Sequence, residues 1–178
     1  MAKTQSRRNF LLTAPLAAAV ALPLTDTLLS AAPMAAGGGQ APAGPTQQPE
    51  AFTADAMAAV AKGLMATNGM KLLLGDPSTN VSVTVSAESK KSGAEFEYHA
   101  HRDHVFVVMD GTTYYEFGGT PQGSHMTKEG EWLAPTSTGH KSVTLNKGDV
   151  LVVPRMTPHK RITEGSVSLI MINSQTPV

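Results

Sequence analysis

The sequence predicts an all-β domain, an antiparallel sandwich or barrel of short strands that follows one short helix. Segments that are apolar, or that alternate apolar with polar residues, recur between residues 70 and 172, which is typical of strands. Pairs of residues that favour tight turns separate these segments. Many short strands joined by regular turns are typical of a sandwich or barrel.

The helix is expected over 53–66, where alanine and methionine dominate. Thr53 or Asp55 can cap its N-terminus, and Gly69 can end it. The strands expected after the helix are 70–74, 81–86, 95–101, 105–109, 112–117, 142–145, 150–153, 160–163 and 167–172. The turns expected between them include Asp110-Gly111, Gly118-Gly119, Lys147-Gly148 and Glu164-Gly165.

One stretch interrupts this pattern. Residues 120–140 are rich in glycine, proline and serine and carry Trp132, His125 and His140. We expect a long ordered loop here, of the kind that forms lids or binding loops. His125 and His140 are therefore interpreted as loop histidines.

The first part of the chain is expected to be a targeting segment. Ser6-Arg7-Arg8-Asn9-Phe10-Leu11 resembles the twin-arginine export signal, and an apolar stretch from Leu11 to Leu24 follows it. That stretch is broken by two prolines and is short for a membrane span. Residues 1–37 are thus predicted to be a signal peptide and 38–50 a flexible linker, with a periplasmic or otherwise exported product that keeps no membrane anchor. An uncleaved N-terminal anchor is the alternative.

Composition excludes several functions for the remaining domain, residues 51–178. Over the whole chain basic and acidic residues balance, 14 of each, and no basic run suits nucleic acid, so no nucleic-acid partner is expected. The chain has no cysteine, which excludes disulfides, thiol catalysis and thiolate ligands. The hydrophobic core and a bound metal must therefore supply the stability.

Histidines provide the clearest chemical signal. All six lie between residues 99 and 159, and three form the run His99-Ala100-His101-Arg102-Asp103-His104. A His-x-His pair on a strand puts both imidazoles on one face, because side chains alternate. With His159 from elsewhere in the chain, these residues predict a site for a divalent metal.

At this point the residues resemble the cupin superfamily, over about residues 70–173. Its first motif reads Gly, five residues, His-x-His, three or four residues, Glu, six residues, Gly. Gly93 and His99-Ala100-His101 fit the beginning. Six residues separate His104 from Gly111, at the place where the family usually has Glu, and only two residues separate His104 from His101.

The second motif reads Gly, five residues, Pro-x-Gly, two residues, His, three residues, Asn. Gly148, Pro154 and His159 match it in spacing, whereas Met156 replaces the Gly and Thr163 replaces the Asn. The resemblance implies a jelly-roll barrel whose interior can hold a ligand.

The resemblance also implies a single divalent ion held by His99, His101, His104 and His159. Asp103 could point inward in place of His104. Imidazole suits several metals, and export in the folded state would allow loading in the cytoplasm, so Fe or Mn is favoured, with Zn, Ni and Cu as alternatives. Four neutral ligands would leave the ion its full charge, which favours an anionic ligand or carbonyl polarisation.

Two carboxylates share the phase of these histidines along their strand. Glu95 and Glu97 should both face the barrel interior. Glu97 is the candidate catalytic residue, as a proton carrier or as a hydrogen-bond partner of a ligand. A solvated carboxylate at the rim is the alternative. Arg102 and Arg161 are expected to be solvated.

The same alternation along the strand points Phe96 and Tyr98 outward, where other residues must cover their apolar surface. A second copy of the chain could supply this cover, and the resemblance implies a homodimer. The chain's own segment 70–74 is the alternative cover.

Two classes of function remain open. One is an exported mononuclear metal cupin of oxygenase or isomerase type that acts on a small acidic or enolisable molecule. The other is a non-catalytic periplasmic protein that binds a small ligand or a metal. A metal-free structural role has little support. A metal with an open position beside a proton-transfer group would favour the enzyme, because a shared fold does not decide function.

Overall fold

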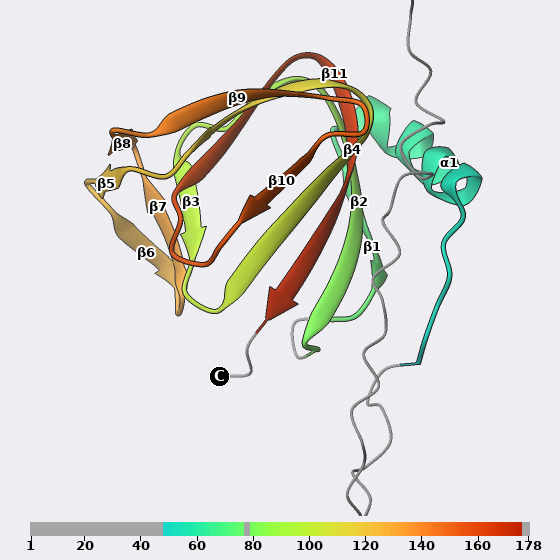
Figure 1. Cartoon of the computed structure of the whole chain (residues 1–178), viewed down its shortest axis with the longest axis horizontal. Coiled ribbons are helices and arrows are strands. Elements are labelled where there is room, and N and C mark those ends of the chain that lie inside the picture. Colours follow the sequence, from blue (N-terminus) through green and yellow to red (C-terminus); the bar gives the residue numbers. More distant parts are fainter. Residues whose placement is uncertain (1–47, 77–78, 176–178) are drawn as a thin grey trace, which may run out of the picture. The chain divides into compact units, whose positions relative to one another are not determined.

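The computed structural model describes residues 48–76 and 79–175 (Figure 1). The predicted signal peptide and most of the predicted linker lie outside these residues. The described helices are α1 (Ala54–Leu64) and a short 3₁₀ helix (Met65–Thr67). The described strands are β1 (Met70–Leu74), β2 (Val81–Ser92), β3 (Phe96–His99), β4 (Arg102–Phe117), β5 (Thr120–Gln122), β6 (His125–Lys128), β7 (Glu131–Ala134), β8 (Thr136–Thr138), β9 (Lys141–Asn146), β10 (Val150–Val153) and β11 (His159–Gln175). No helix among the described residues is long and apolar enough to cross a membrane.

The two longest strands, β4 and β11, organise the fold. They pair with each other along most of their length, and all the pairs in the sheets are antiparallel. β11 also pairs with β2, and the free edge of β4 takes β10 and then β9. At His159, β11 reaches β3, and the sheet continues through β7 to β6. The predicted all-β antiparallel jelly roll with one N-terminal helix is confirmed.

Two expected turns are instead bulges within continuous strands. Asp110-Gly111 lies inside β4, and Glu164-Gly165 lies inside β11, where the register shifts between Thr163 and Ser166. Gly111 adopts φ +80°, and a Cβ there would meet the carbonyl oxygen of Ser166 at 2.1 Å. Glycine at such a position allows a bulge without reversing the chain, so each pair of predicted strands merges into one.

The expected loop over 120–140 is also corrected. It contains the four short strands β5 to β8, and β7 pairs with β3. Trp132 of β7 stacks on Tyr98 of β3, with ring centroids 6.0 Å apart and an interplanar angle of 10°. Cross-strand pairing of this kind holds segments whose glycine and proline content hides any strand periodicity.

The helix packs on the outer face of β2. The Thr53 hydroxyl accepts a hydrogen bond from the Ala56 amide at 3.2 Å, which confirms the expected cap. Ala61 packs with Val85 and Ala87 of β2, all of them buried. Because α1 covers the apolar face of β2, the polar face of that strand points into the barrel.

The barrel interior holds an apolar cluster and a set of buried polar residues, here called the apolar layer and the polar layer. The apolar layer consists of Phe106, Val108, Tyr115, Leu145, Leu151, Val153, Val167 and Leu169. Beside it lie polar residues of β2, of which Ser86 and Glu88 are only 4% and 2% exposed. This polar layer leads to the three buried histidines at one end of the barrel.

Candidate metal centre

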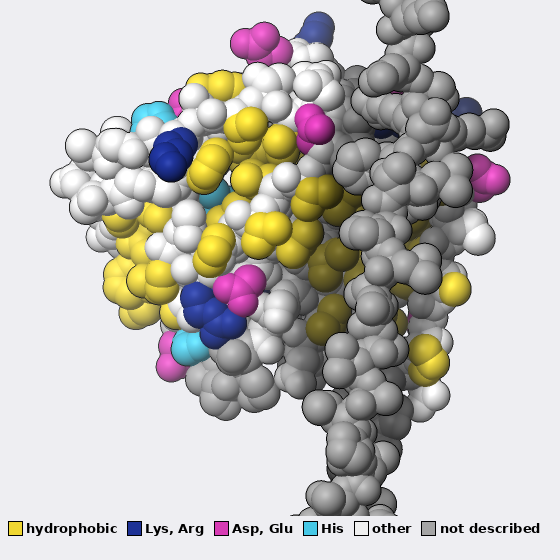
Figure 2. All heavy atoms as spheres, in the orientation of Figure 1, with side chains coloured by type: hydrophobic (Ala, Val, Ile, Leu, Met, Phe, Trp, Pro, Cys, Tyr) yellow, Lys and Arg dark blue, Asp and Glu magenta, His cyan; other side chains and the backbone are white. Residues whose placement is uncertain are grey.

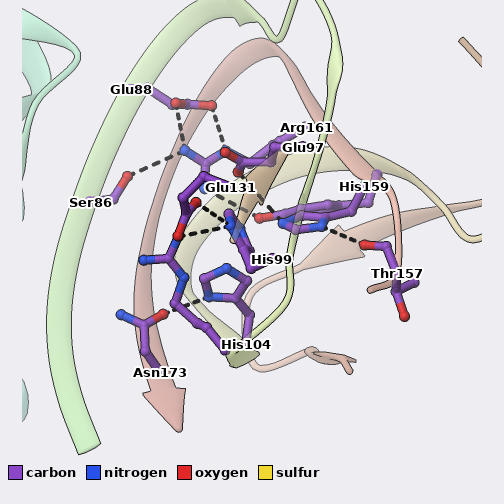
Figure 3. Close-up of polar contacts among 12 residues, drawn as sticks. Ser86, Glu88, Glu97, His99, His104, Glu131, Thr157, His159, Arg161 and Asn173 are labelled. Atoms are coloured by element: carbon purple, nitrogen blue, oxygen red, sulfur yellow. Dashed lines mark hydrogen bonds and ion pairs between the residues drawn. The ribbon is translucent and has the colours of Figure 1, made fainter. Parts of the chain in front are cut away.

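Three strand ends bring three histidines together. His99 is the last residue of β3, His104 lies near the start of β4, and His159 begins β11. Their ring centroids are 4.7 to 5.6 Å apart, and all three side chains are buried. Figure 3 shows the rings converging on one point.

Each ring is held through its Nδ1 atom. Nδ1 of His99 donates to Oε2 of Glu131 at 2.5 Å, and Nδ1 of His104 donates to Oδ1 of Asn173 at 2.5 Å. Nδ1 of His159 donates to the Thr157 carbonyl at 3.0 Å. With protons on Nδ1, each ring presents the lone pair of Nε2 to the interior.

The three Nε2 atoms have no hydrogen-bond partner, although they are buried. The candidate ligand atoms of these residues all lie within 4.8 Å of one another. Buried polar atoms without partners are costly in a folded protein, and a divalent ion among them would satisfy all three. The residues therefore fit a metal ion.

Burial also keeps the three rings neutral. It lowers the pKa of His99 and of His159, and it lowers the pKa of His104 to about 3, an effect that the neighbouring histidines and Arg102 increase. Metal ligation needs the neutral form of imidazole. At neutral pH all three side chains are therefore ready to bind an ion.

His101 lies outside this group. Strand β3 ends at His99 and the chain bends over the next two residues, so the alternation that would place both imidazoles on one face stops there. The His101 ring packs instead against Gly130, where a Cβ would meet its Cδ2 atom at 2.8 Å. The expected four-histidine set is thus reduced to three, and Asp103 points away from it to accept from Arg155 at 2.7 Å.

Glu97 lies at the edge of the centre. It stands opposite His159 in the β3–β11 pair, and its Oε1 is 3.5 Å from the unpartnered Nε2 of His159. Its side chain is 55% exposed and lines the cavity, as does that of Glu95. Glu95 precedes β3, and the exposure of Glu97 is that of a carboxylate at the rim of the cavity.

This arrangement suggests a second way to place the first motif on the sequence. Glu97-x-His99, four residues, His104, six residues and Gly111 follow the pattern with no shortened turn. In this register Glu97 takes the place of the first histidine and His104 that of the glutamate, while Lys91 replaces the opening glycine. The match of His99-Ala100-His101 to the His-x-His of the motif favoured the other placement in the sequence.

The centre opens into a cavity of about 450 Å³. Arg161 lines it and is not solvated as expected: its Nε and Nη2 donate to the two carboxylate oxygens of Glu88 at 2.8 and 2.7 Å. Arg102 is likewise engaged, since its Nη2 donates to both oxygens of Glu131 at 2.6 Å. Burial alone would raise the pKa of Glu88, but the bonds and charge of Arg161 outweigh it and lower that pKa.

The departures from the second motif have visible consequences. Met156 adopts φ +59°, the left-handed conformation that glycine would take without strain. Thr163 is buried, and its hydroxyl donates to Oε1 of Glu88 at 2.7 Å.

Phe96 and Tyr98 are covered within the chain. Phe96 is 2% exposed, with the Lys160 Nζ 4.6 Å from its ring centroid and the His140 ring beside it. Tyr98 is 5% exposed beneath Trp132. Neither segment 70–74 nor a second copy of the chain covers these two side chains. This reason for a dimer is therefore removed, and the homodimer stays a prediction.

Comparison with known proteins agrees with the fold. A family model described as Cupin matches residues 73–177, more than half of the chain. No curated protein matches the sequence. Among solved structures, KdgF from a Halomonas species is 17% identical over 60% of this chain and 77% of that one, with a TM-score of 0.43.

Two further solved structures are also similar to this chain in fold. BH2720 from Bacillus halodurans is 15% identical over 73% of this chain and 85% of that one, with a TM-score of 0.50. Protein NMB1881 from Neisseria meningitidis is 15% identical over 71% of this chain and 100% of that one, with a TM-score of 0.48. At such identities the likeness concerns the fold alone.

Proposed function

The chain belongs to the cupin family, and we propose that it is an exported mononuclear metal enzyme of oxygenase or isomerase type that acts on a small acidic or enolisable molecule. The observation that carries the metal proposal is the set of three buried Nε2 atoms without partners. The open cavity beside them favours catalysis, because a structural metal site is usually closed by its ligands.

His99, His104 and His159 would hold the ion, with Fe or Mn favoured. A divalent ion there would act as a Lewis acid toward an oxygen of the substrate. The cavity admits a molecule of substrate size, and Glu131, Asn173 and Thr157 would keep the rings in place.

Glu97 can act in two ways. As a ligand it would complete a set of three histidines and one carboxylate. The alternative placement of the first motif, which begins at Glu97-x-His99, favours this role. As a free base it would take a proton from a carbon next to a polarised carbonyl. Glu97→Gln, compared with Glu95→Gln, separates the two: loss of metal affinity indicates a ligand, whereas full metal content with lost turnover indicates a proton carrier.

The test of the function is direct. Protein loaded with Fe(II) or Mn(II) is examined for oxygen uptake and for isomerisation with small diketones, phenols and oxo acids. Turnover that disappears in His159→Ala and persists in His101→Ala supports the enzyme. Tight binding of one of these compounds without turnover would instead support the non-catalytic binding protein.

Export is tested separately. Replacing Arg7-Arg8 by Lys-Lys should leave the folded precursor in the cytoplasm, because the twin-arginine signal that these residues resemble depends on the arginines. Finding the variant outside the inner membrane would exclude this route.

A further inference from the structure

A second polar cluster shares the cavity with the histidines. It consists of Glu88, Tyr115 and Arg161, and it lies on the strands β2, β4 and β11. The Nη1 atom of Arg161 donates to the Tyr115 hydroxyl at 3.2 Å, while its Nε and Nη2 hold Glu88. Tyr115 and Glu88 are only 1% and 2% exposed. Figure 3 shows Arg161 between Glu88 and the histidines.

The cluster leaves two hydrogen-bond donors for a ligand. A guanidinium has five N–H groups; in Arg161, Nε bonds Glu88, Nη2 bonds Glu88 and Ser86, and one Nη1–H bonds Tyr115. The second Nη1–H and the O–H of Tyr115 remain. Burial raises the pKa of Tyr115 to about 12, so the hydroxyl keeps its proton. Both residues line the cavity.

A single ring separates this cluster from the metal ligands. The Phe106 ring centroid lies 5.1 Å from that of Tyr115 and 5.3 Å from that of His104. One ligand that engages both ends must therefore carry two oxygen-bearing groups with a few carbon atoms between them. The four cations that line the cavity are each paired with a carboxylate: Lys91 and Arg161 with Glu88, Arg102 with Glu131, and Lys160 with Glu116. A metal ion would add the positive charge that suits an anionic ligand.

We propose that Tyr115 and Arg161 bind the second oxygen-bearing group of a metal-bound ligand, so that the site takes short dicarboxylic or oxo-carboxylic acids. This inference rests on the proposed metal function. The metal would hold one end of the acid, and the Tyr115 O–H and the free Nη1–H would donate to the far carboxylate. A ligand without that far group would leave both donors buried and unpaired, which is the strongest form of discrimination a polar site offers.

The test uses the Co(II)-loaded protein and two acids of equal length, glutarate and pentanoate. Calorimetry measures affinity, and the visible Co(II) spectrum reports binding at the metal. We expect glutarate to bind about tenfold or more tightly than pentanoate. Tyr115→Phe should reduce this preference to about threefold or less with the Co(II) content unchanged. Tyr114→Phe, at the preceding position of β4 and outside the cavity, should keep this preference.

Each outcome decides the matter. Equal affinity of the unaltered Co(II) protein for both acids overturns this inference and leaves the metal function standing, and this comparison needs no variant to fold. A preference that survives in folded Tyr115→Phe also overturns it. A protein that takes up no Co(II) overturns the metal function, and the inference with it.

Discussion

Glu131 accepts a hydrogen bond from Nδ1 of His99 at 2.5 Å, and the two residues face each other directly in the β3–β7 pair. A strand from the segment expected to be a loop thus orients one of the three candidate metal ligands. The carboxylate fixes the proton on Nδ1 and so aims the Nε2 lone pair at the centre. The candidate centre therefore includes a residue of β7, a strand that carries none of the three histidines.

Glu131→Gln should weaken metal binding by about 10- to 100-fold while the protein stays folded. The amide can still accept from Nδ1, but it loses the charge that makes His99 a stronger ligand. Competition with a coloured chelator measures the affinity. Glu129→Gln, an exposed neighbour, is the control, and equal affinities of the two variants would remove the role given to Glu131.

The stability of the metal-free protein should depend on the charge state of His104. Its folded pKa of about 3 lies below the ordinary value of 6.5, so the unfolded chain binds more protons between these pH values. Stability is therefore complete above pH 6.5 and decreases as the pH falls, by about 1.4 kcal/mol per pH unit for this histidine. Urea denaturation at pH 6.5 and 5 measures it, and a flat free energy of unfolding across this range would contradict the prediction.

Met156→Gly should stabilise the domain by about 0.5–1 kcal/mol. The left-handed backbone at Met156 costs an ordinary residue about 1–2 kcal/mol, part of which the greater freedom of glycine in the unfolded chain offsets. The Met156 side chain is 54% exposed, so little packing is lost. Met156→Ala keeps the strain and should give no gain. Denaturation of the three proteins provides the comparison.

The homodimer needs a different surface from the one first expected. Val150 and Val152 on β10 are 55% and 59% exposed, and β10 pairs only with β4 among the described strands. Figure 2 shows hydrophobic side chains gathered on this face. In sedimentation at micromolar concentration we expect a dimer that Val152→Asp dissociates and Val152→Thr keeps. A monomeric unaltered protein would exclude the dimer.

Local patterns in the sequence predict many of the strands and all three clustered histidines. His99, His104 and His159 follow from motif spacing, and β1 and β10 have the expected bounds. His101 was included because the strand was expected to continue past His99, and no local signal marks the bend. Glu131 and Asn173 lie 32 and 69 positions from their histidines, so only the folded sheet brings them together.

The sequence does not predict the polar interior of the barrel, for a different reason. Alternation of valine with serine and threonine in β2 usually means that the polar face meets water. Here α1 covers Val85 and Ala87, and the polar face, which includes Ser86 and Glu88, turns inward. Arg161 is partly buried, where it pairs with that carboxylate. A pattern of period two locates the two faces of a strand, but the partner of each face is decided by tertiary packing.

The most direct test of the central claim is the metal content of the protein after loading and desalting, measured by elemental analysis. The unaltered protein and His101→Ala should each hold one divalent ion per chain, whereas the double variant His99→Ala, His159→Ala should hold none and lose the thermal stabilisation that the metal gives. Full occupancy in that double variant, or loss of the ion in His101→Ala alone, would contradict the assignment of the centre to His99, His104 and His159.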